Sequence, residues 1–445
     1  MKIADIRAEY RALIEADPEG NRQGALKIKD NMERSDLYFK DRFTSQTLQI
    51  PRIYTRDVID QFEDIVSTSY GIFVKVIKEY QEHEDFRALF GFPKEDEELI
   101  LLPCGYDSLL PIARFDIFYQ EETGNFWFCE INTDGTSGMN EDRLQDAFMI
   151  HNPAHQEMRR RYSFEPLELF DSWVKTFLRL YKTFEHPVEK PNVVITDFLD
   201  RGTIREFEEF VRHFQKAGVN CELCDIRDFE FRDGKLYTPT GHVVDAIYRR
   251  AVTTDIFDAR DEVKPFIDAV RAKACFVAGS FCTQIIHHKK LFHVLHLPRT
   301  AEILTPEENA FIKAHVPATF PFTAEYISLD EVKANKDKYI LKPEDSYASQ
   351  GVYAGVEYDN ETWDAHAEEA FENGYICQQY CPQHSAENID FAFGDGKWHS
   401  YIDMAGLYAY DGKFAGVFSR AAEGNGIIAS HRNERTQATY VVDEF

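Results

Sequence analysis

The sequence predicts a mixed protein that has both α+β and α/β parts. Three observations support this prediction: residues 1–98 carry charged helical patterns, residues 99–150 contain two alternating strands, and residues 192–278 alternate strand-like with helix-like segments. Strand–helix alternation is typical of a parallel sheet covered by helices, whereas a hairpin indicates antiparallel pairing. Residues 279–445 again contain mainly short strands.

Composition limits the class of protein. The 445 residues, 44% of them hydrophobic, can fill two or three domains. No apolar run approaches the roughly 20 residues of a membrane span, and the N-terminus lacks a secretory apolar region, so we expect a cytoplasmic protein without membrane contact. The net charge of −27 disfavours nucleic-acid binding and is compatible with a cationic substrate such as a polyamine. The eight cysteines are expected to be reduced thiols, not a disulfide framework or a zinc site.

The first region, residues 1–98, is expected to be mostly helical. Apolar residues recur at helical spacing from Asp57 toward Tyr80, which predicts a long amphipathic helix.

A hairpin near residue 120 carries the strongest chemical signal. Two alternating stretches, IARFDIFY and FWFCEIN, are separated by the glycine-containing connector QEETGN. Alternation places Arg114 and Asp116 on one face of the first strand, and Glu130 and Asn132 on one face of the second. If the two faces coincide, the oxygen donors suit Mg²⁺ and the arginine suits a phosphoryl group. An amphipathic hairpin with a charged outer face explains the same pattern about equally well.

Residues 151–278 contain the predicted α/β unit. A helical stretch ends near residue 190, and after it come the strand NVVITDF, a helix over Thr203–Ala217, and the strands NCELCDI and VVDAIYRR. This order predicts a small, partly parallel sheet.

The last region, 279–445, contains a second set of candidate residues. A helix is expected around His287–Leu295, which includes Lys289 and Lys290, and strands are expected at YILK, YICQQY, IDFAF, HSYIDM and FAGVFSR. Lys342 ends the first of these strands and is followed by PEDSYASQG, a loop of small residues. Such a loop can offer backbone N–H groups to phosphates while the lysine supplies a point charge, although a surface hairpin is about equally consistent.

Two further positions in this region carry hydrogen-bonding or charged groups. Gln378 and Gln379 lie where a chain crossing between two lobes can present polar groups to adenine. Arg420 ends FAGVFSR and is a candidate phosphate clamp or, alternatively, the partner of a surface salt bridge.

Taken in order, these segments resemble the glutathionylspermidine synthetase family. RFD at Arg114–Asp116 and EINTD at Glu130–Asp134 match its R-x-D and E-x-N metal motif. The apolar segment that ends at Lys289 and Lys290 matches its first ATP lysine, and Lys342 matches its second. ICQQYCP resembles its hinge, GVFSR its late arginine, and DAIYRR its pre-ATP-grasp portion.

The resemblance implies an ATP-grasp fold with circularly permuted chain order, because the metal residues precede the lysines. Residues 1–98 would be a helical N-terminal region and 99–150 the metal-binding part of the ATP-grasp core. Residues 151–278 would form a helical connector and a pre-ATP-grasp α/β domain, and 279–445 the nucleotide-binding lobes. The resemblance covers roughly residues 100–440.

The resemblance also implies a reaction, the ATP-dependent joining of a carboxylate to an amine through an acyl phosphate, with release of ADP. The residues it assigns fall into four groups: Asp116, Glu130 and Asn132 for Mg²⁺, with two ions expected; Lys342, Gly351, Gln378, Gln379 and one of Lys289 and Lys290 for ATP; Arg114 and Arg420 for the transferring phosphoryl group; Thr136 and Ser137 for substrate.

Three departures leave the substrates open. The phosphate loop is longer and lacks the arginine that the family places before its glycine, MAGLYAY stands where the family has a tryptophan strand, and no amidase domain precedes the synthetase part. A peptide-like acid and a polyamine are candidates, but glutathione, spermidine and a homo-oligomeric state are undetermined. A phosphotransferase and a non-catalytic nucleotide-binding module are the alternatives. The presence of Asp116, Glu130 and Asn132 disfavours the module.

Overall fold

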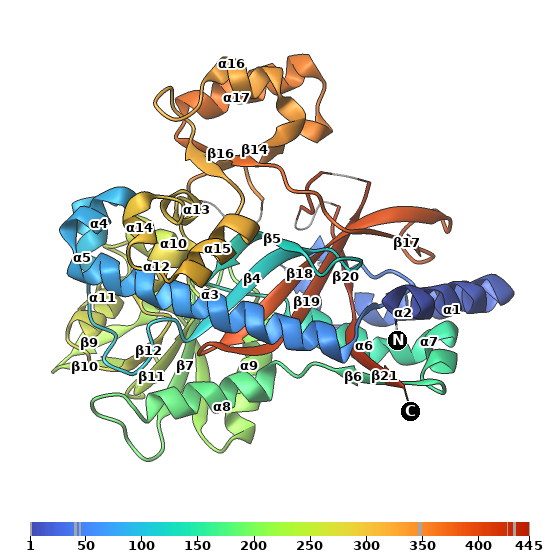
Figure 1. The fold of residues 1–445 in the computed structure, drawn as a ribbon. Helices are drawn as coiled ribbons and strands as arrows, with labels where there is room; N and C mark the ends of the chain where they lie inside the picture. Colours follow the sequence, from blue (N-terminus) through green and yellow to red (C-terminus); the bar gives the residue numbers. More distant parts are fainter. Residues whose placement is uncertain are drawn as a thin grey trace.

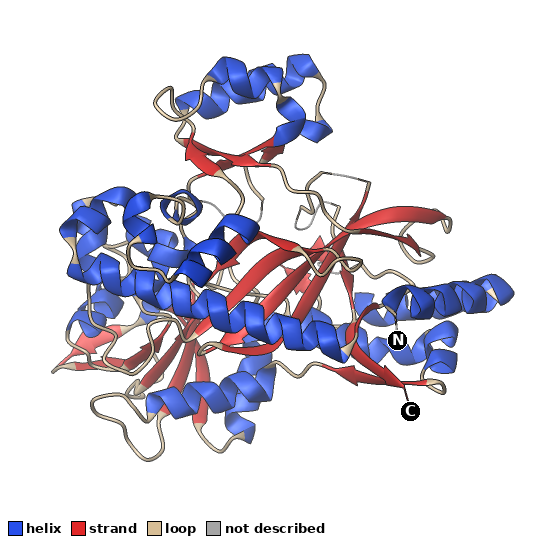
Figure 2. Ribbon diagram, in the orientation of Figure 1, coloured by secondary structure: helices blue, strands red, loops and turns tan. Residues whose placement is uncertain are grey.

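The computed structural model shows a mixed α/β protein with several sheets, as predicted (Figure 2). It describes residues 2–39, 42–43, 46–345, 349–424, 426–429 and 433–444. Within these residues no helix combines the length and the apolar character that a membrane crossing requires.

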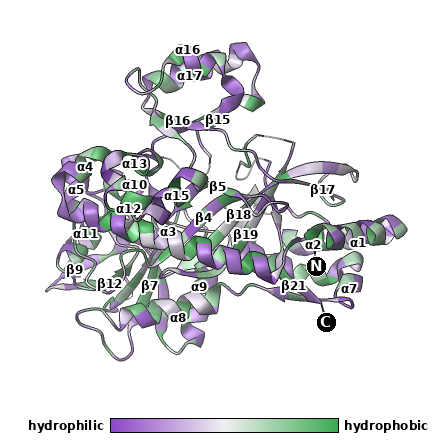
Figure 3. Ribbon diagram, viewed as in Figure 1, coloured by the Kyte–Doolittle hydropathy of each residue, from purple (hydrophilic) through white to green (hydrophobic). Residues whose placement is uncertain are grey.

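The N-terminal region is helical, and its longest helix packs on the central sheet (Figure 1). Its elements are α1 (Ile3–Ala16), α2 (Pro18–Glu33), β1 (Tyr38–Phe39), β2 (Arg42–Phe43), β3 (Arg52–Tyr54), α3 (Arg56–Glu82), α4 (Glu84–Phe90) and α5 (Lys94–Ile100). Both apolar and polar residues recur along α3 (Figure 3), and the apolar ones that are buried recur at helical spacing. Its buried Phe73 meets Phe115 of the sheet with ring centroids 5.4 Å apart. The predicted amphipathic helix is therefore confirmed.

The central sheet has the strand order β20-β19-β18-β4-β5, and β17 pairs with β18. The strands are β4 (Ile112–Tyr119), β5 (Phe126–Asn132), β17 (Ser385–Ile389), β18 (Trp398–Tyr410), β19 (Lys413–Glu423) and β20 (Arg435–Gln437). The two stretches predicted as a hairpin are β4 and β5, and they pair antiparallel. The strand predicted at IDFAF is wrong beyond Ile389, because the Asp390 carboxylate accepts the backbone N–H groups of Ala392 and Phe393 and turns the chain.

A short sheet ties the two ends of the chain together. It runs β3-β21-β6, with β6 (Tyr162–Pro166) and β21 (Thr439–Glu444) antiparallel and β3 parallel to β21. Beside it lie α6 (Met139–Phe148), η1 (Met149–His151) and α7 (Pro153–Met158).

The predicted α/β unit is present, and its sheet is parallel throughout, in the order β12-β11-β7-β8. Its elements are α8 (Phe170–Tyr181), β7 (Asn192–Asp197), α9 (Ile204–Lys216), β8 (Asn220–Asp225), η2 (Ile226–Asp228), β9 (Glu230–Arg232), β10 (Lys235–Tyr237), β11 (Ala246–Arg249), α10 (Thr253–Asp258), α11 (Lys264–Arg271) and β12 (Phe276–Ala278). The helix predicted over Thr203–Ala217 is α9.

After this unit the chain forms short helices, namely η3 (Phe281–Thr283), α12 (Gln284–His287), α13 (Leu291–Val294), α14 (Pro298–Ala301) and α15 (Pro306–His315). The single helix predicted around His287–Leu295 is wrong, because His288 has an extended backbone (φ −66°, ψ 127°) that ends α12. The chain therefore changes direction at Lys289 and Lys290.

A small lobe stands apart from the rest of the molecule (Figure 1). Its antiparallel sheet runs β13-β16-β14-β15 and is covered by two helices. The elements are β13 (Thr319–Pro321), α16 (Leu329–Ala334), η4 (Lys336–Lys338), β14 (Tyr339–Pro343), β15 (Tyr353–Ala354), η5 (Gly355–Glu357), α17 (Asn360–Glu372) and β16 (Tyr375–Gln379). Trp363 of α17, Leu341 and Cys377 belong to a hydrophobic cluster of this lobe's own.

Candidate active site

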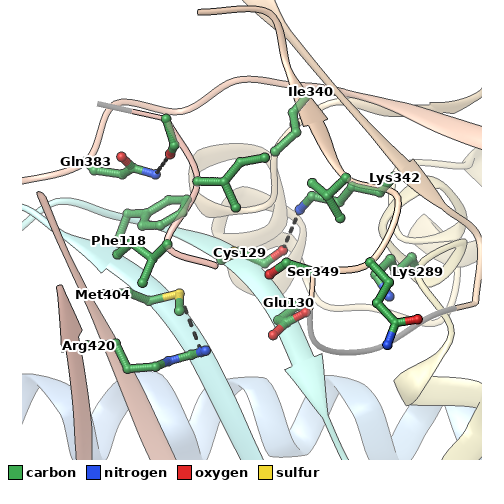
Figure 4. A pocket seen from close by; sticks show the side chains of 15 residues that line it. Phe118, Cys129, Glu130, Lys289, Ile340, Lys342, Ser349, Gln383, Met404 and Arg420 are labelled. Atoms are coloured by element: carbon green, nitrogen blue, oxygen red, sulfur yellow. Dashed lines mark hydrogen bonds between the residues drawn. The ribbon is translucent and has the colours of Figure 1, made fainter. Parts of the chain in front are cut away.

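A pocket lies between the central sheet and the small lobe (Figure 4). It encloses about 580 Å³, open in part to solvent. Its lining combines apolar with charged side chains. The lining residues are Phe118, Cys129, Glu130, Lys289, Ile340, Lys342, Ser349, Gln350, Val352, Gln383, Met404, Arg420, Gly426, Ile427 and Ile428.

Strand register brings the predicted hairpin residues together. Asp116 pairs directly with Glu130, and Arg114 with Asn132, so all four side chains share one face of the sheet. Immediately beyond Asp116 the register shifts, and Ile117 pairs with Phe128. The shift leaves Cys129 as an additional residue in β5, as in a β-bulge.

Two arginines hold the Asp116 carboxylate. Arg114 donates from Nε to Oδ1 at 2.7 Å and from Nη2 to Oδ2 at 2.9 Å, and Arg420 donates from Nη2 to Oδ2 at 2.6 Å. Burial alone would lower the pKa of Arg114, but the charge and hydrogen bond of Asp116, together with Tyr408 and Glu130, hold that pKa well above its usual value. A Cβ on Gly406 would lie 2.8 Å from both Arg114 Cδ and Asp116 Oδ1, so the cluster requires glycine on β18.

Glu130 is the carboxylate that faces the pocket. In Figure 4 it lies between Lys289 on one side and Arg420 on the other. Burial would raise the pKa of Glu130, but Lys289, Arg420 and Lys342 together lower it to about 2. Glu130 is therefore a carboxylate in a cationic surrounding, which is suited to a polyanionic ligand.

Carboxylate and amide oxygens are hard donors that fit Mg²⁺. Glu130 and Asn132 lie side by side, with Asn132 Nδ2 3.3 Å from Glu130 Oε1 and 3.1 Å from Asp116 Oδ2. Asp116 is the least available donor of the three because both of its oxygens accept hydrogen bonds from arginines. The donor set fits a magnesium ion at Glu130, with Asn132 and Asp116 beside it.

The two adjacent lysines point to different places. Lys289 lines the pocket, and burial lowers the pKa of Lys289 although Glu130 opposes that shift. Lys290 donates from Nζ to the carbonyl of Phe90 at 3.0 Å, beside α4. The structure thus brings Lys289 into the pocket and leaves Lys290 outside it, while their roles toward ATP stay predictions.

Lys342 also reaches the pocket, and it is held by neutral groups. Its Nζ donates to the carbonyl of Cys129 at 3.0 Å and to Gln378 Oε1 at 2.7 Å, and Gln378 in turn donates to Thr319 Oγ1 at 3.0 Å. Gln378 therefore orients the lysine. Gln379, the next residue on the strand, is exposed and does not line the pocket.

The loop after Lys342 is described only in part. Ser346–Ala348 of the predicted phosphate loop lie outside the described residues, whereas Ser349 and Gln350 line the pocket. Gly351 has φ +68°, and a Cβ there would lie 2.8 Å from the hydroxyl of Tyr375, so this turn requires glycine.

Thr136 and Ser137 lie in the loop that follows β5. Thr136 is buried, and the carbonyl of Ser137 accepts from Arg114 Nη1 at 2.6 Å and from the hydroxyl of Tyr408 at 2.8 Å. The loop is therefore attached to the arginine that holds Asp116.

Two buried carboxylates that the sequence analysis did not single out anchor this loop. Asp134 accepts from Arg249 Nη2 and Thr283 Oγ1, each at 2.9 Å. Glu206 accepts from the backbone N–H of Gly138 at 3.1 Å and from Arg250 Nη2 at 2.9 Å. The arginine pair in DAIYRR signalled one side of this network, but Glu206 lies on an amphipathic helix with nothing local to mark it.

Comparisons with known proteins identify the fold. No protein-family model matches the chain, and no curated protein matches it. A glutathione synthetase-like effector from Globodera pallida, solved in its apo form, aligns with a TM-score of 0.63 at 12% identity, over 96% of this chain and 98% of that one. A putative gamma-glutamylcysteine synthetase from Methylobacillus flagellatus KT aligns with a TM-score of 0.43 at 9% identity, over 89% of each chain. The first alignment shows that this chain and the effector share an overall fold.

Proposed function

We propose that this protein is an ATP-dependent ligase of the ATP-grasp type, which joins a carboxylate to an amine and releases ADP and phosphate. The observation that carries the proposal is the convergence of Glu130, Lys289, Lys342 and Arg420 on one pocket between two sheets. The fold shared with a glutathione synthetase-like effector supports it. Since the metal residues precede both lysines in the chain, we further propose the circularly permuted order.

The pocket matches the two ends of ATP. Phe118, Ile340 and Met404 offer apolar contact to the adenine. Lys289 and Lys342, which line the same pocket, supply ammonium groups for the phosphates. Glu130, with Asn132 and Asp116, would hold Mg²⁺, which neutralises phosphate charge.

The chain's own residues then account for the two chemical steps. A substrate carboxylate oxygen attacks the γ-phosphorus and ADP leaves, while Arg420, held against Asp116, stabilises the charge on the phosphoryl oxygens. The amine next attacks the carbonyl carbon of the acyl phosphate, phosphate leaves with the C–O electron pair, and the amine loses a proton. Arg114 fixes Asp116 and, through Ser137, the adjoining loop.

The substrates are proposed only by class. Thr136 and Ser137 lie on the loop after β5, which the Ser137 carbonyl attaches to Arg114, and a peptide-like acid with a polyamine fits the resemblance. The net charge of −27 is compatible with a cationic acceptor.

The test measures ADP release with ATP and Mg²⁺ across panels of peptide-like acids and of amines, with mass spectrometry of each product. The proposal expects ADP release that requires both an acid and an amine, and a product equal in mass to the two substrates less water. ADP release with a phosphorylated hydroxyl compound would instead identify a phosphotransferase. Tight ATP binding without ADP release under any combination would identify a non-catalytic module.

A further inference from the structure

Two cysteines far apart in the chain lie in contact outside the pocket. Cys104, in the loop after α5, and Cys282, in η3, have their Sγ atoms 3.4 Å apart although 178 positions separate them. All eight cysteines fall within the described residues, and each is a free thiol. No other pair of them makes a sulfur–sulfur hydrogen bond in the part of the chain that the structure describes.

The two thiols have different access to solvent. Cys104 is partly exposed, whereas Cys282 is fully buried and its Sγ lies 3.5 Å from the carbonyl oxygen of Leu109. A reagent in solution therefore reaches Cys104 first. Cys282 is positioned behind it, where it can attack whatever forms on the Cys104 sulfur.

The same contact shifts the pKa values of the two thiols in opposite directions. The hydrogen bond shared with Cys282 lowers the pKa of Cys104 against the effect of burial, and Ser280 assists. That contact, together with burial, raises the pKa of Cys282. Burial raises the pKa of Cys129 to about 11 and those of Cys275 and Cys377 to about 12. The surroundings of Cys104 therefore favour its thiolate form, the nucleophilic form of a cysteine, whereas those of the other cysteines named here oppose it.

We propose that Cys104 and Cys282 are a reversible modification site that closes to an intramolecular disulfide on reaction with a low-molecular-weight disulfide. The Cys104 thiolate attacks one sulfur of the reagent, forms a mixed disulfide and releases one thiolate. Cys282 gives its proton to that thiolate and displaces the second thiol from Cys104. Two protein thiols and one small disulfide become one protein disulfide and two small thiols, so two electrons pass to the reagent.

The bridge would form beside residues that support the pocket. Thr283 directly follows Cys282; its Oγ1 donates to Asp134 at 2.9 Å and its carbonyl accepts from Thr133 at 2.9 Å. From there α12 leads to Lys289. A disulfide would tether this segment to the loop after α5, and the long closed loop should raise the melting temperature.

The experiment exposes the reduced, full-length protein to graded ratios of bis(2-hydroxyethyl) disulfide and 2-mercaptoethanol, then alkylates and digests it. We expect native protein to lose two of its eight thiols, to yield a peptide pair joined through Cys104 and Cys282, and to melt at a higher temperature than the reduced form. Retention of all the thiols, or a bridge between other cysteines, would overturn the proposal.

Three variants separate the roles. Cys282→Ser should accumulate the mixed disulfide on Cys104, and Cys104→Ser should form no mixed disulfide with the reagent. The control Cys224→Ser, which removes a buried thiol elsewhere, should form the disulfide between Cys104 and Cys282 as wild type does. Circular dichroism of each variant under reducing conditions establishes that it folds. A mixed disulfide that persists on Cys104 of the folded wild type would show that Cys282 does not resolve it, and would contradict the proposed pair.

Discussion

Asp116 holds two arginines of the candidate site, and these arginines come from two strands that are distant from each other in sequence. Arg114 lies two positions away on the same strand, whereas Arg420 comes from β19. Removing only one partner of such a buried ion pair lowers the free energy of unfolding strongly, because the remaining charge is left buried without a partner. Of these two arginines, Arg420 lines the pocket and is the one we propose to act on the phosphoryl group, whereas Arg114 fixes Asp116.

Glu130→Ala should abolish turnover and leave the fold intact, because Glu130 faces the pocket and fills no core. We expect ADP release to fall by a factor on the order of 10² or more. Glu185→Ala, on an exposed glutamate paired with Lys273, is the matched control and should retain wild-type rates. Near-normal ADP release from the Glu130 variant would show that the hairpin of β4 and β5 is not part of the active site.

Arg420→Ala should lower kcat more than it raises KM for ATP, by a factor on the order of 10² to 10³. Arg420→Lys should rescue poorly, since an ammonium cannot reproduce the paired donors of a guanidinium. Steady-state kinetics and melting curves are both needed, because Arg420 also pairs with buried Asp116. A lower melting temperature with unchanged kcat would make Arg420 a salt-bridge partner only.

At the scale of elements, the break between α12 and α13 separates two lysines that are neighbours in sequence. In a continuous helix, Lys289 and Lys290 would be successive residues on the same helical axis. The extended backbone of His288 instead allows Lys289 to enter the pocket while Lys290 contacts Phe90. The bulge at Cys129 acts similarly on β5, since it leaves a carbonyl that accepts from Lys342.

Lys289→Ala should weaken ATP binding measured by calorimetry, and so should Lys342→Ala, because each removes a charge from the pocket that we propose binds the phosphates. Lys290→Ala removes the same charge from the adjacent position and should leave the affinity unchanged. If Lys289→Ala and Lys290→Ala weakened ATP binding equally, long-range electrostatic attraction would explain both effects, and direct contact between Lys289 and ATP would not be needed.

At the scale of the whole molecule, the pocket joins parts that fold around separate cores. The small lobe has its own hydrophobic cluster, and its sheet faces strands that pack on α3 (Figure 1). The cationic residues of both parts converge on Glu130, so folding itself assembles a charge distribution that the unfolded chain lacks. Stability should therefore depend on the ionisation of this one carboxylate.

The free energy of unfolding should fall in acid partly through Glu130. Its pKa is about 2 in the folded protein, whereas an unfolded chain has about 4.3. The unfolded state takes up the proton first, so this contribution is fully present above about pH 4.3 and is lost as pH falls toward 2. In urea titrations, Glu130→Gln should lose less stability than wild type in that window, by about 2 kcal/mol. Parallel pH profiles for the two proteins would contradict the cationic surrounding of Glu130.

Much of the local structure could be predicted from the sequence. Alternation alone identified β4 and β5 and the faces of Asp116 and Glu130, because side chains in a strand alternate whatever the strand packs against. Strand–helix alternation likewise identified the α/β unit and its helix α9. Both patterns repeat within a few residues, so they can be recognised in the sequence without knowledge of the fold.

Only the tertiary structure decided which of these faces meet and what surrounds them. The register that sets Asp116 against Glu130, the separation of Lys289 from Lys290, the role of Gln378 and the contact between Cys104 and Cys282 all depend on residues distant in the chain. Such contacts arise from packing and hydrogen bonding between elements, and they leave no periodic pattern in a single sequence. The sequence by itself therefore determined the chemistry available to the site, and the fold determined which groups share it.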